Sequence, residues 1–282
     1  MNVDPQWIAR KFPGLNAIAR LTTGGQKAVF AAEHPEHGAV VFKMIHPSQG
    51  EQSVQRERLA VERVQSPRVP RILDAGEIAA DLGPCFWFLE QRIQGLTLGN
   101  ILRRDGPFDT ETTMLLGAQM LEAINAAEEV HIVHRDIKPD NIMLDDGGNF
   151  WLLDFGIARH LTLTAITDIE SRWGKFTPGY APPEQFRNLQ SEIDSRADLF
   201  ALGITLYECR TGTNPFWSGV SSPLEVLRRV EGMPLPRLGV NTVPDEFADF
   251  VAVLAQRRRD HRPRTAGMAL QWINEIREKY IV

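Results

Sequence analysis

Long apolar runs, numerous cysteines and an excess of basic residues are all missing from this chain of 282 residues. No stretch of about 18 consecutive apolar residues occurs, so no membrane-inserted segment is predicted. The only two cysteines, Cys85 and Cys209, stand in apolar runs, which indicates reduced, buried thiols and neither a disulfide framework nor a metal site. The formal net charge of −5 argues against a diffuse basic surface for nucleic acids. These absences favour a cytoplasmic globular protein with no nucleic-acid partner and no membrane insertion.

Internal repeats, low-complexity linkers and a recognisable signal peptide are also missing. Residues 1–11 include Asp4 and lack the continuous apolar stretch that a signal peptide needs. A chain of this length is near the upper limit for one hydrophobic core. One domain in two lobes, or two domains, are therefore the natural organisations.

Strand-like patterns fill the first third of the chain, and helical patterns fill the rest. An apolar–polar pattern typical of a β-hairpin surrounds the turn at 34–38, and one charged helix is predicted over 52–65. After residue 95 the pattern predicts a long helix over 110–129 and a continuously apolar, hence buried, helix over 198–209. Five strands with one helix, followed by a mainly helical part, predict an α+β protein.

One stretch, His131–Leu144, holds an acid, a cation and an amide at fixed offsets, in Asp136, Lys138 and Asn141. Phosphoryl transfer uses this inventory. A carboxylate orients and deprotonates the attacking hydroxyl, a cation offsets charge on the moving phosphoryl group, and an amide oxygen helps to hold a metal. Residues 134–141 read H-R-D-I-K-P-D-N, which matches the protein-kinase catalytic loop H-R-D-x-x-x-x-N. The chain therefore resembles a eukaryotic-like protein serine/threonine kinase, as a stand-alone catalytic domain of bacterial type.

This resemblance implies one bilobal kinase domain over residues 1–282. The N-lobe, over about 15–91, would be a small five-stranded antiparallel sheet with one helix, and the larger C-lobe, over about 96–280, would be mainly helical. A hinge over about 90–95 would join them, with ATP and Mg²⁺, or Mn²⁺ in its place, bound between the lobes. The oligomeric state does not follow from the resemblance.

Metal and phosphate ligands follow from two further motifs. The tripeptide D-F-G begins at Asp154 and resembles the metal-binding motif of the family, so Asp154 and Asn141 are the expected magnesium ligands. Lys43 resembles the lysine that binds the α- and β-phosphates. Glu57, inside the predicted helix, stands where the family places the partner of this lysine, and Glu62 is the competing candidate.

The glycine-rich loop is the weakest match to the family. Only Gly24 coincides with one of its glycines, and Lys27 stands where another is expected. Because side chains alternate along a strand, Lys27 would share the nucleotide-facing side with Val29 and offer its ammonium group to the phosphates, unless the strand twists it towards solvent. The resemblance implies five further adenine contacts. Val41 would lie above the base, Met143 would lie below it, and Leu89 would be the gatekeeper. Glu90 and Arg92, in the hinge, would offer backbone groups to the base.

The stretch 177–184 resembles the end of a kinase activation segment. Thr177 matches the threonine that contacts the catalytic aspartate and lysine in serine/threonine kinases, so the implied partner is a protein substrate carrying serine or threonine. Glu184 would pair with Arg262, and Asp198 would bind the backbone of the catalytic loop.

Phosphorylation of the activation segment is a further implication. Arg135 precedes the catalytic aspartate, and in kinases with this arginine a phosphate on the activation segment usually organises the loop. Autophosphorylation is therefore expected at one or more hydroxyl residues that precede Thr177, and an unmodified polar loop is the alternative. The candidates are Thr162, Thr164, Thr167 and Ser171.

Two other functions remain open from the sequence. A pseudokinase that serves as a binding module is favoured by the degenerate glycine-rich loop, but the residues needed for catalysis are all present. A small-molecule phosphotransferase would share the aspartate and the asparagine but would lack Lys138 and the stretch 177–184.

Overall fold

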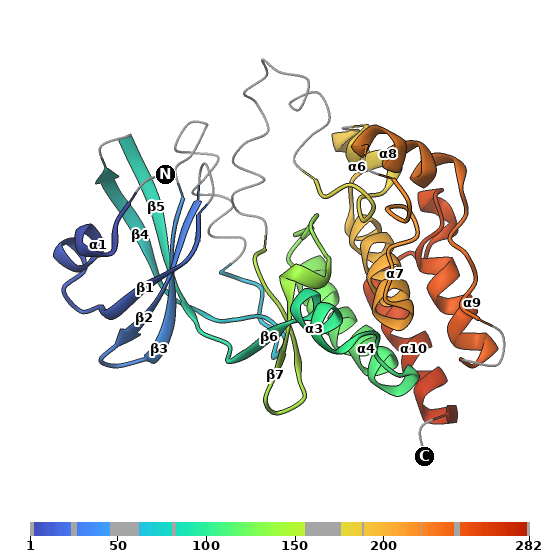
Figure 1. Ribbon diagram of the computed structural model, residues 1–282, viewed down its shortest axis with the longest axis horizontal. Coiled ribbons are helices and arrows are strands. Elements are labelled where there is room, and N and C mark those ends of the chain that lie inside the picture. Colours follow the sequence, from blue (N-terminus) through green and yellow to red (C-terminus); the bar gives the residue numbers. More distant parts are fainter. Residues whose placement is uncertain are drawn as a thin grey trace. The chain divides into compact units, whose positions relative to one another are not determined.

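The computed structural model describes most of the chain, and its described residues fall into two compact units (Figure 1). Those of the first unit lie within Met1–Arg63 and Pro70–Gln94, and those of the second within Val64–Val69, Gly95–Gly156 and Ile166–Val282. The described ranges are 3–23, 27–45, 62–80, 83–155, 176–187, 189–220, 222–239 and 243–280.

The first unit is built on a five-stranded antiparallel sheet with the strand order β1-β2-β3-β5-β4. Its strands are β1 (Asn16–Thr23), β2 (Lys27–His34), β3 (Gly38–Ile45), β4 (Ile72–Ala80) and β5 (Gly83–Gln91). The predicted hairpin is the β2–β3 pair, in which His34 lies opposite Gly38. Gly38 has a φ of 66°, a conformation that a glycine adopts without the steric cost of a Cβ atom. The predicted antiparallel sheet is confirmed.

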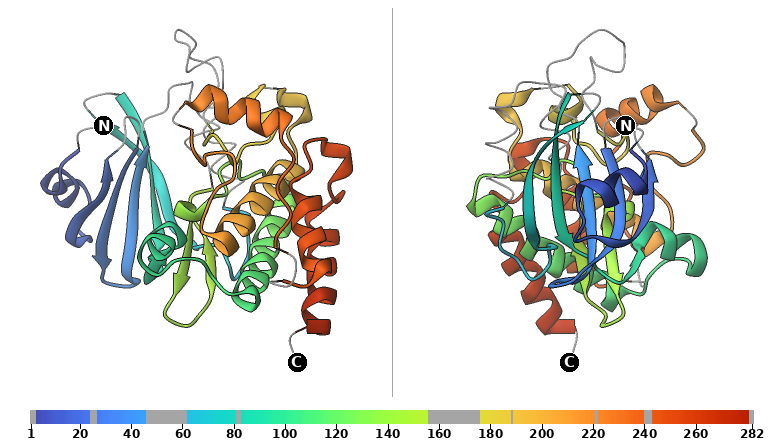
Figure 2. Two further views of the ribbon diagram at one scale, coloured as in Figure 1. Left: turned by 45° about the vertical axis from the view of Figure 1, so that its right-hand side comes forward. Right: turned by 90° about the vertical axis from the view of Figure 1, so that its left-hand side faces the viewer.

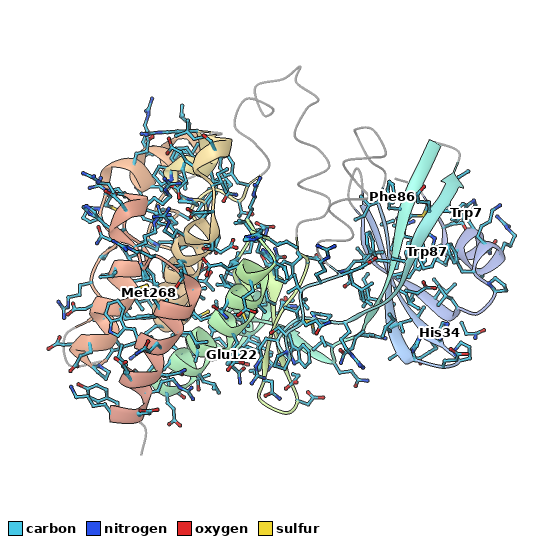
Figure 3. All side chains as sticks on the ribbon, turned by 180° about the vertical axis from the view of Figure 1, so that it is seen from behind. Trp7, His34, Phe86, Trp87, Glu122 and Met268 are labelled. Carbon is cyan, nitrogen blue, oxygen red and sulfur yellow. The ribbon has the colours of Figure 1, made fainter. Side chains whose placement is uncertain are left out.

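The two faces of this sheet carry different side chains because residues alternate along each strand. On one face, Phe42 and Leu89 belong to a buried cluster that also includes Ile8 of helix α1 (Pro5–Lys11), with Trp87 packed against it. On the other face, Phe86 and its neighbours form a separate small cluster. Phe86 and Trp87 are adjacent in β5 but belong to these different clusters (Figure 3). Helix α1 therefore covers one face of the sheet with apolar contacts.

Helix α1 begins where its sequence predicts a helix start. The Asp4 carboxylate accepts a hydrogen bond of 2.6 Å from the amide of Trp7, and Pro5 occupies the first helical position. Arg10 and Lys11 lie in the last turn, where positive charge is favourable. These features stabilise a helix of only seven residues.

The second unit is mainly helical and carries a small three-stranded sheet of order β6-β7-β8. The strands are β6 (Gly95–Thr97), β7 (Ile142–Asp145) and β8 (Phe150–Leu152). The α-helices are α3 (Leu98–Asp105), α4 (Thr110–Glu129), α6 (Pro183–Phe186), α7 (Ser195–Thr211), α8 (Pro223–Gly232), α9 (Asp245–Leu254) and α10 (Ala266–Tyr280), with 3-10 turns at Pro139–Asn141, Gln190–Glu192 and Arg259–His261. Helices α4 and α9 both contact α7, and α10 (red) contacts α4 (Figure 2).

Helix α7 is the buried centre of the second unit, as its continuous apolar sequence predicts. It begins three residues before the predicted start because Asp194 caps it, accepting a hydrogen bond of 3.0 Å from the amide of Arg196. It ends at Gly212, which has a φ of 78°. Most of the helix predicted over 52–65 lies outside the described residues. Within the described part of the chain, no helix is both long and apolar enough to cross a membrane.

The packing of α1 leads to a stability prediction. Ile8 is fully buried, so Ile8→Ala should lower the free energy of unfolding by about 2–5 kcal/mol through lost burial and a residual cavity. Leu21 of β1 is 50% exposed, and Leu21→Ala serves as the control, with an expected change within about 0.5 kcal/mol. Urea denaturation followed by tryptophan fluorescence measures both. Equal changes in the two variants would mean that α1 does not contribute to this core.

Candidate active site

The backbone of the catalytic loop is held by the carboxylate of Asp198, in the first turn of α7. Its Oδ2 accepts a hydrogen bond of 2.7 Å from the amide of His134, and its Oδ1 accepts one of 2.8 Å from the amide of Arg135. Burial raises the pKa of the Asp198 carboxyl to about 7, while the two amide hydrogen bonds oppose the rise by stabilising the charged form. Arg135 has a φ of 65°, which costs a non-glycine residue about 1–2 kcal/mol. The bond to Asp198 helps to offset this strain and confirms the predicted role of Asp198.

His134 connects the loop to the strand that leads into Asp154. Its Nδ1 accepts a hydrogen bond of 3.2 Å from the amide of Asp136, so the ring proton lies on Nε2, which donates to the carbonyl of Leu153 at 2.8 Å. The His134 ring also packs against Phe155, with 4.8 Å between ring centroids. Sequence reasoning gave His134 no role, although it is the first residue of the matched motif.

Four polar side chains form a closed network at the predicted catalytic residues. Thr177 donates its hydroxyl proton to Asp136 Oδ1 at 2.8 Å and accepts a hydrogen bond of 2.8 Å from Lys138 Nζ. Asn141 Nδ2 donates to Asp136 Oδ2 at 2.9 Å, and Lys138 Nζ lies 3.3 Å from the same oxygen. The Asp136 side chain is 10% exposed and that of Lys138 is 19% exposed. The structure thus brings together the three predicted catalytic residues and Thr177, which was predicted to contact two of them.

The neighbouring residues have the chemistry that a magnesium ion requires. Asn141 uses its Nδ2 group for Asp136, so its Oδ1 is the atom that can bind a cation. The amide of Leu153 donates to the Asn141 carbonyl at 2.9 Å, which brings the backbone next to Asp154 close to Asn141. Among the described residues, no group of three or more acidic, histidine or cysteine side chains could hold a metal ion. One amide oxygen and one carboxylate suit a hard cation that takes its other ligands from phosphates and water.

The end of the activation segment is anchored by a buried ion pair. Arg262 donates to the two carboxylate oxygens of Glu184 at 2.6 and 3.2 Å, and the two side chains are 0% and 6% exposed. Burial lowers the pKa of the Arg262 guanidinium, and Glu184 opposes this shift. The next residue, Gln185, donates to the carbonyl of Arg135 at 2.8 Å. The predicted pairing is confirmed, and it ties the segment that follows Thr177 to the catalytic loop.

In the first unit, the ammonium group of Lys43 donates to Glu90 Oε2, and each side chain is 11% exposed. Val29 lies opposite Lys43 in the β2–β3 register, and Val41 lies opposite Glu90 in the β3–β5 register. Cross-strand partners share a face of a sheet, so the four residues share one face.

Leu89, the predicted gatekeeper, does not share a face of the sheet with Lys43. Leu89 is 4% exposed and belongs to the cluster beneath α1, on the face opposite Lys43, whereas Glu90 faces Lys43. The amide of Arg92 donates to the carbonyl of Ala39 at 3.4 Å. That N–H group already donates to β3. The only backbone group that Arg92 could offer to adenine is therefore its carbonyl.

Several other predicted residues cannot be placed in the same way. Gly24 and Glu57 lie outside the described residues, so the Lys43–Glu57 pairing stays a prediction. Lys27 begins β2 opposite Ile45, but its side chain is outside the described part of the structure. Met143 lies in β7 of the second unit, opposite Trp151.

The Asp198 contacts lead to a second stability prediction. In Asp198→Asn the side-chain NH₂ group would face a backbone N–H group, so one hydrogen bond is lost and a buried donor is left unsatisfied. The free energy of unfolding should fall by about 1–3 kcal/mol. Asp146→Asn, at an exposed site, is the control and should change little. Matching urea midpoints for Asp198→Asn and the unmodified protein would contradict this account of the loop.

Comparisons with known proteins agree with this geometry. The family model described as "Protein kinase domain" matches residues 16–273. Serine/threonine-protein kinase PknH of Mycobacterium tuberculosis is 31% identical over 254 residues, which cover 88% of this chain and 39% of PknH. PknB of Mycolicibacterium smegmatis is 31% identical over 215 residues, covering 75% of this chain and 34% of PknB. The chain thus spans about two fifths or less of the length of these relatives. It belongs to the protein kinase family, and within that family it is similar to bacterial kinases of the serine/threonine type.

Proposed function

We propose that this chain transfers the γ-phosphate of ATP to serine or threonine hydroxyls of protein substrates. The observation that carries the proposal is the closed network of Asp136, Lys138, Asn141 and Thr177. It fixes a carboxylate, a cation and an amide oxygen relative to one another. Catalysis of phosphoryl transfer depends chiefly on such positioning, because the transition state is loose.

Each residue of the network has a defined task. Asp136 binds the substrate hydroxyl and takes its proton as the oxygen attacks, and Lys138 stabilises negative charge on the transferred phosphoryl group. Asn141 and Asp154 hold the divalent metal, which we take to be Mg²⁺ with Mn²⁺ as a possible substitute. When bound, the metal neutralises charge on the phosphates. Thr177 holds both Asp136 and Lys138, a contact that supports serine or threonine as the acceptor.

The two units correspond, in this proposal, to the lobes of one kinase domain. The N-lobe covers about 15–91, the hinge about 90–95 and the C-lobe about 96–280, and the boundary between units at Gln94 and Gly95 supports this division. Lys43 would bind the α- and β-phosphates, with Val29 and Val41 beside the base.

A cytoplasmic location is proposed on the state of the cysteines. Cys85 and Cys209 are free and buried, and burial raises the pKa of both thiols. Such thiols suit a reducing compartment.

Two alternative functions have less support. A pseudokinase would explain the single matching glycine of the glycine-rich loop, but it would not require the catalytic network. A small-molecule phosphotransferase would not need the Lys138–Thr177 contact, which belongs to the activation segment.

The proposal is tested by separating chemistry from nucleotide binding. Asp136→Asn should reduce phosphoryl transfer to a protein substrate to below about a tenth and retain ATP binding, because it removes the base alone. Asp154→Asn should abolish transfer and most magnesium-dependent ATP binding. Asp146→Asn should change neither. Transfer is followed with labelled ATP and binding by calorimetry. An Asp136→Asn protein that keeps more than about a tenth of the activity would contradict the role of Asp136 as the base.

Autophosphorylation is the second expectation of this function. A phosphate brings nearly two negative charges and acceptors for a guanidinium, and Arg135 lies beside the catalytic aspartate. The candidate acceptors Thr162, Thr164, Thr167 and Ser171 all lie outside the described residues. Incubation with ATP should add one or more phosphate masses, and Asp136→Asn protein treated alone should gain none. Unchanged intact mass in protein that phosphorylates other substrates would rule the prediction out.

A further inference from the structure

The ion pair between Lys43 and Glu90 is built within a single sheet. Lys43 of β3 lies opposite Phe88 of β5, and Glu90 lies two residues further along β5, on the same face. Diagonal neighbours of this kind are within reach of long side chains. The pair therefore follows from the β3–β5 register, and it does not depend on the helix predicted over 52–65.

The two charged side chains of the pair are buried among apolar residues. Its side chains are 11% exposed, and Phe88 and Ile45 beside them on this face are 0% and 3% exposed. Removing two charges from water is costly, and an apolar residue at position 90 would avoid that cost. A carboxylate at this place therefore offsets the cost of burying the Lys43 charge.

A carboxylate partner has two effects on a lysine. It favours the charged ammonium over the neutral amine, and it restricts a flexible side chain to one direction. The ammonium has three N–H donors, so it can donate to phosphate oxygens as well as to a carboxylate. Both effects serve a lysine that must meet a polyphosphate.

We propose that Glu90 is a positioning residue for Lys43 that keeps its ammonium charged and directed for the phosphates of the nucleotide. The inference rests on the phosphate-binding role proposed above for Lys43. It assigns Glu90 a side-chain function in place of the backbone contact to adenine that the sequence suggested. The side chain at this position then determines how tightly phosphates are bound, without changing how the base is bound.

The coupling between the two side chains can be measured without nucleotide. The rate at which an N-hydroxysuccinimide ester acylates Lys43 at pH 8 is measured by peptide mass spectrometry. Because the carboxylate protects the ammonium form, Glu90→Gln should raise this rate by about 5- to 10-fold. Glu33→Gln removes the same charge from an exposed position in β2 and should leave the rate unchanged.

The consequence for binding is measured with ATP, ADP and adenosine. Glu90→Gln should weaken ATP and ADP by about 5- to 10-fold and leave adenosine affinity unchanged, since only the phosphates meet Lys43. Lys43→Ala should show the same pattern more strongly. A loss confined to the phosphate-bearing ligands separates positioning of Lys43 from a general disturbance of the sheet, which would weaken adenosine too.

The outcomes distinguish this inference from the proposed function. The role of Glu90 alone would be overturned if Glu90→Gln left the acylation rate of Lys43 unchanged. It would also be overturned if Glu90→Gln bound ATP as tightly as the unmodified protein, or more tightly, while Lys43→Ala lost affinity. Full ATP affinity in Lys43→Ala would overturn the phosphate role of Lys43 itself. If Glu90→Gln does not fold by circular dichroism, Glu90→Asp replaces it. This variant keeps the charge but shortens the side chain, so acylation should stay slow while ATP affinity falls several-fold, and unchanged affinity would refute the inference.

Discussion

One buried carboxylate sets the conformation on which the catalytic network depends. Asp198 accepts the amides of His134 and Arg135 with its two oxygens, and it does so from α7, the buried centre of its unit. Both oxygens are used, so the two amides are fixed in direction as well as in position. The left-handed conformation of Arg135 turns the chain so that the amide of Asp136 donates a hydrogen bond to the ring of His134. A rigid helix thereby positions a loop that has no regular hydrogen-bond ladder.

A second set of contacts brings the activation segment to the same place. The Glu184–Arg262 pair is buried, and Gln185 bonds to the catalytic-loop backbone, so the chain on the C-terminal side of Thr177 is fixed. Breaking such a pair by removing one partner is costly because the other charge stays buried. Thr177 can then contact both Asp136 and Lys138. The structure thus fixes the positions of these groups relative to one another.

The sequence predicted the network but not the register of β5. Fixed spacing within one loop constrains Asp136, Lys138 and Asn141, and the continuous apolar pattern of 198–209 identified the buried helix to within three residues at its start. The run Cys85–Leu89 is wholly apolar, because α1 covers one sheet face and the other is also buried. Without alternation the sequence could not show which residues face Lys43, and Glu90 was given a backbone role. His134 was missed because its bonds go to backbone groups that lie far apart in the sequence.

The central claim is that this network transfers phosphate to serine or threonine. The most direct test is phosphoamino-acid analysis of a generic basic protein incubated with the chain, magnesium and γ-labelled ATP. The account predicts label on phosphoserine or phosphothreonine, and none when the metal is chelated. Label on phosphotyrosine, or ATP binding without any transfer to protein, would contradict it.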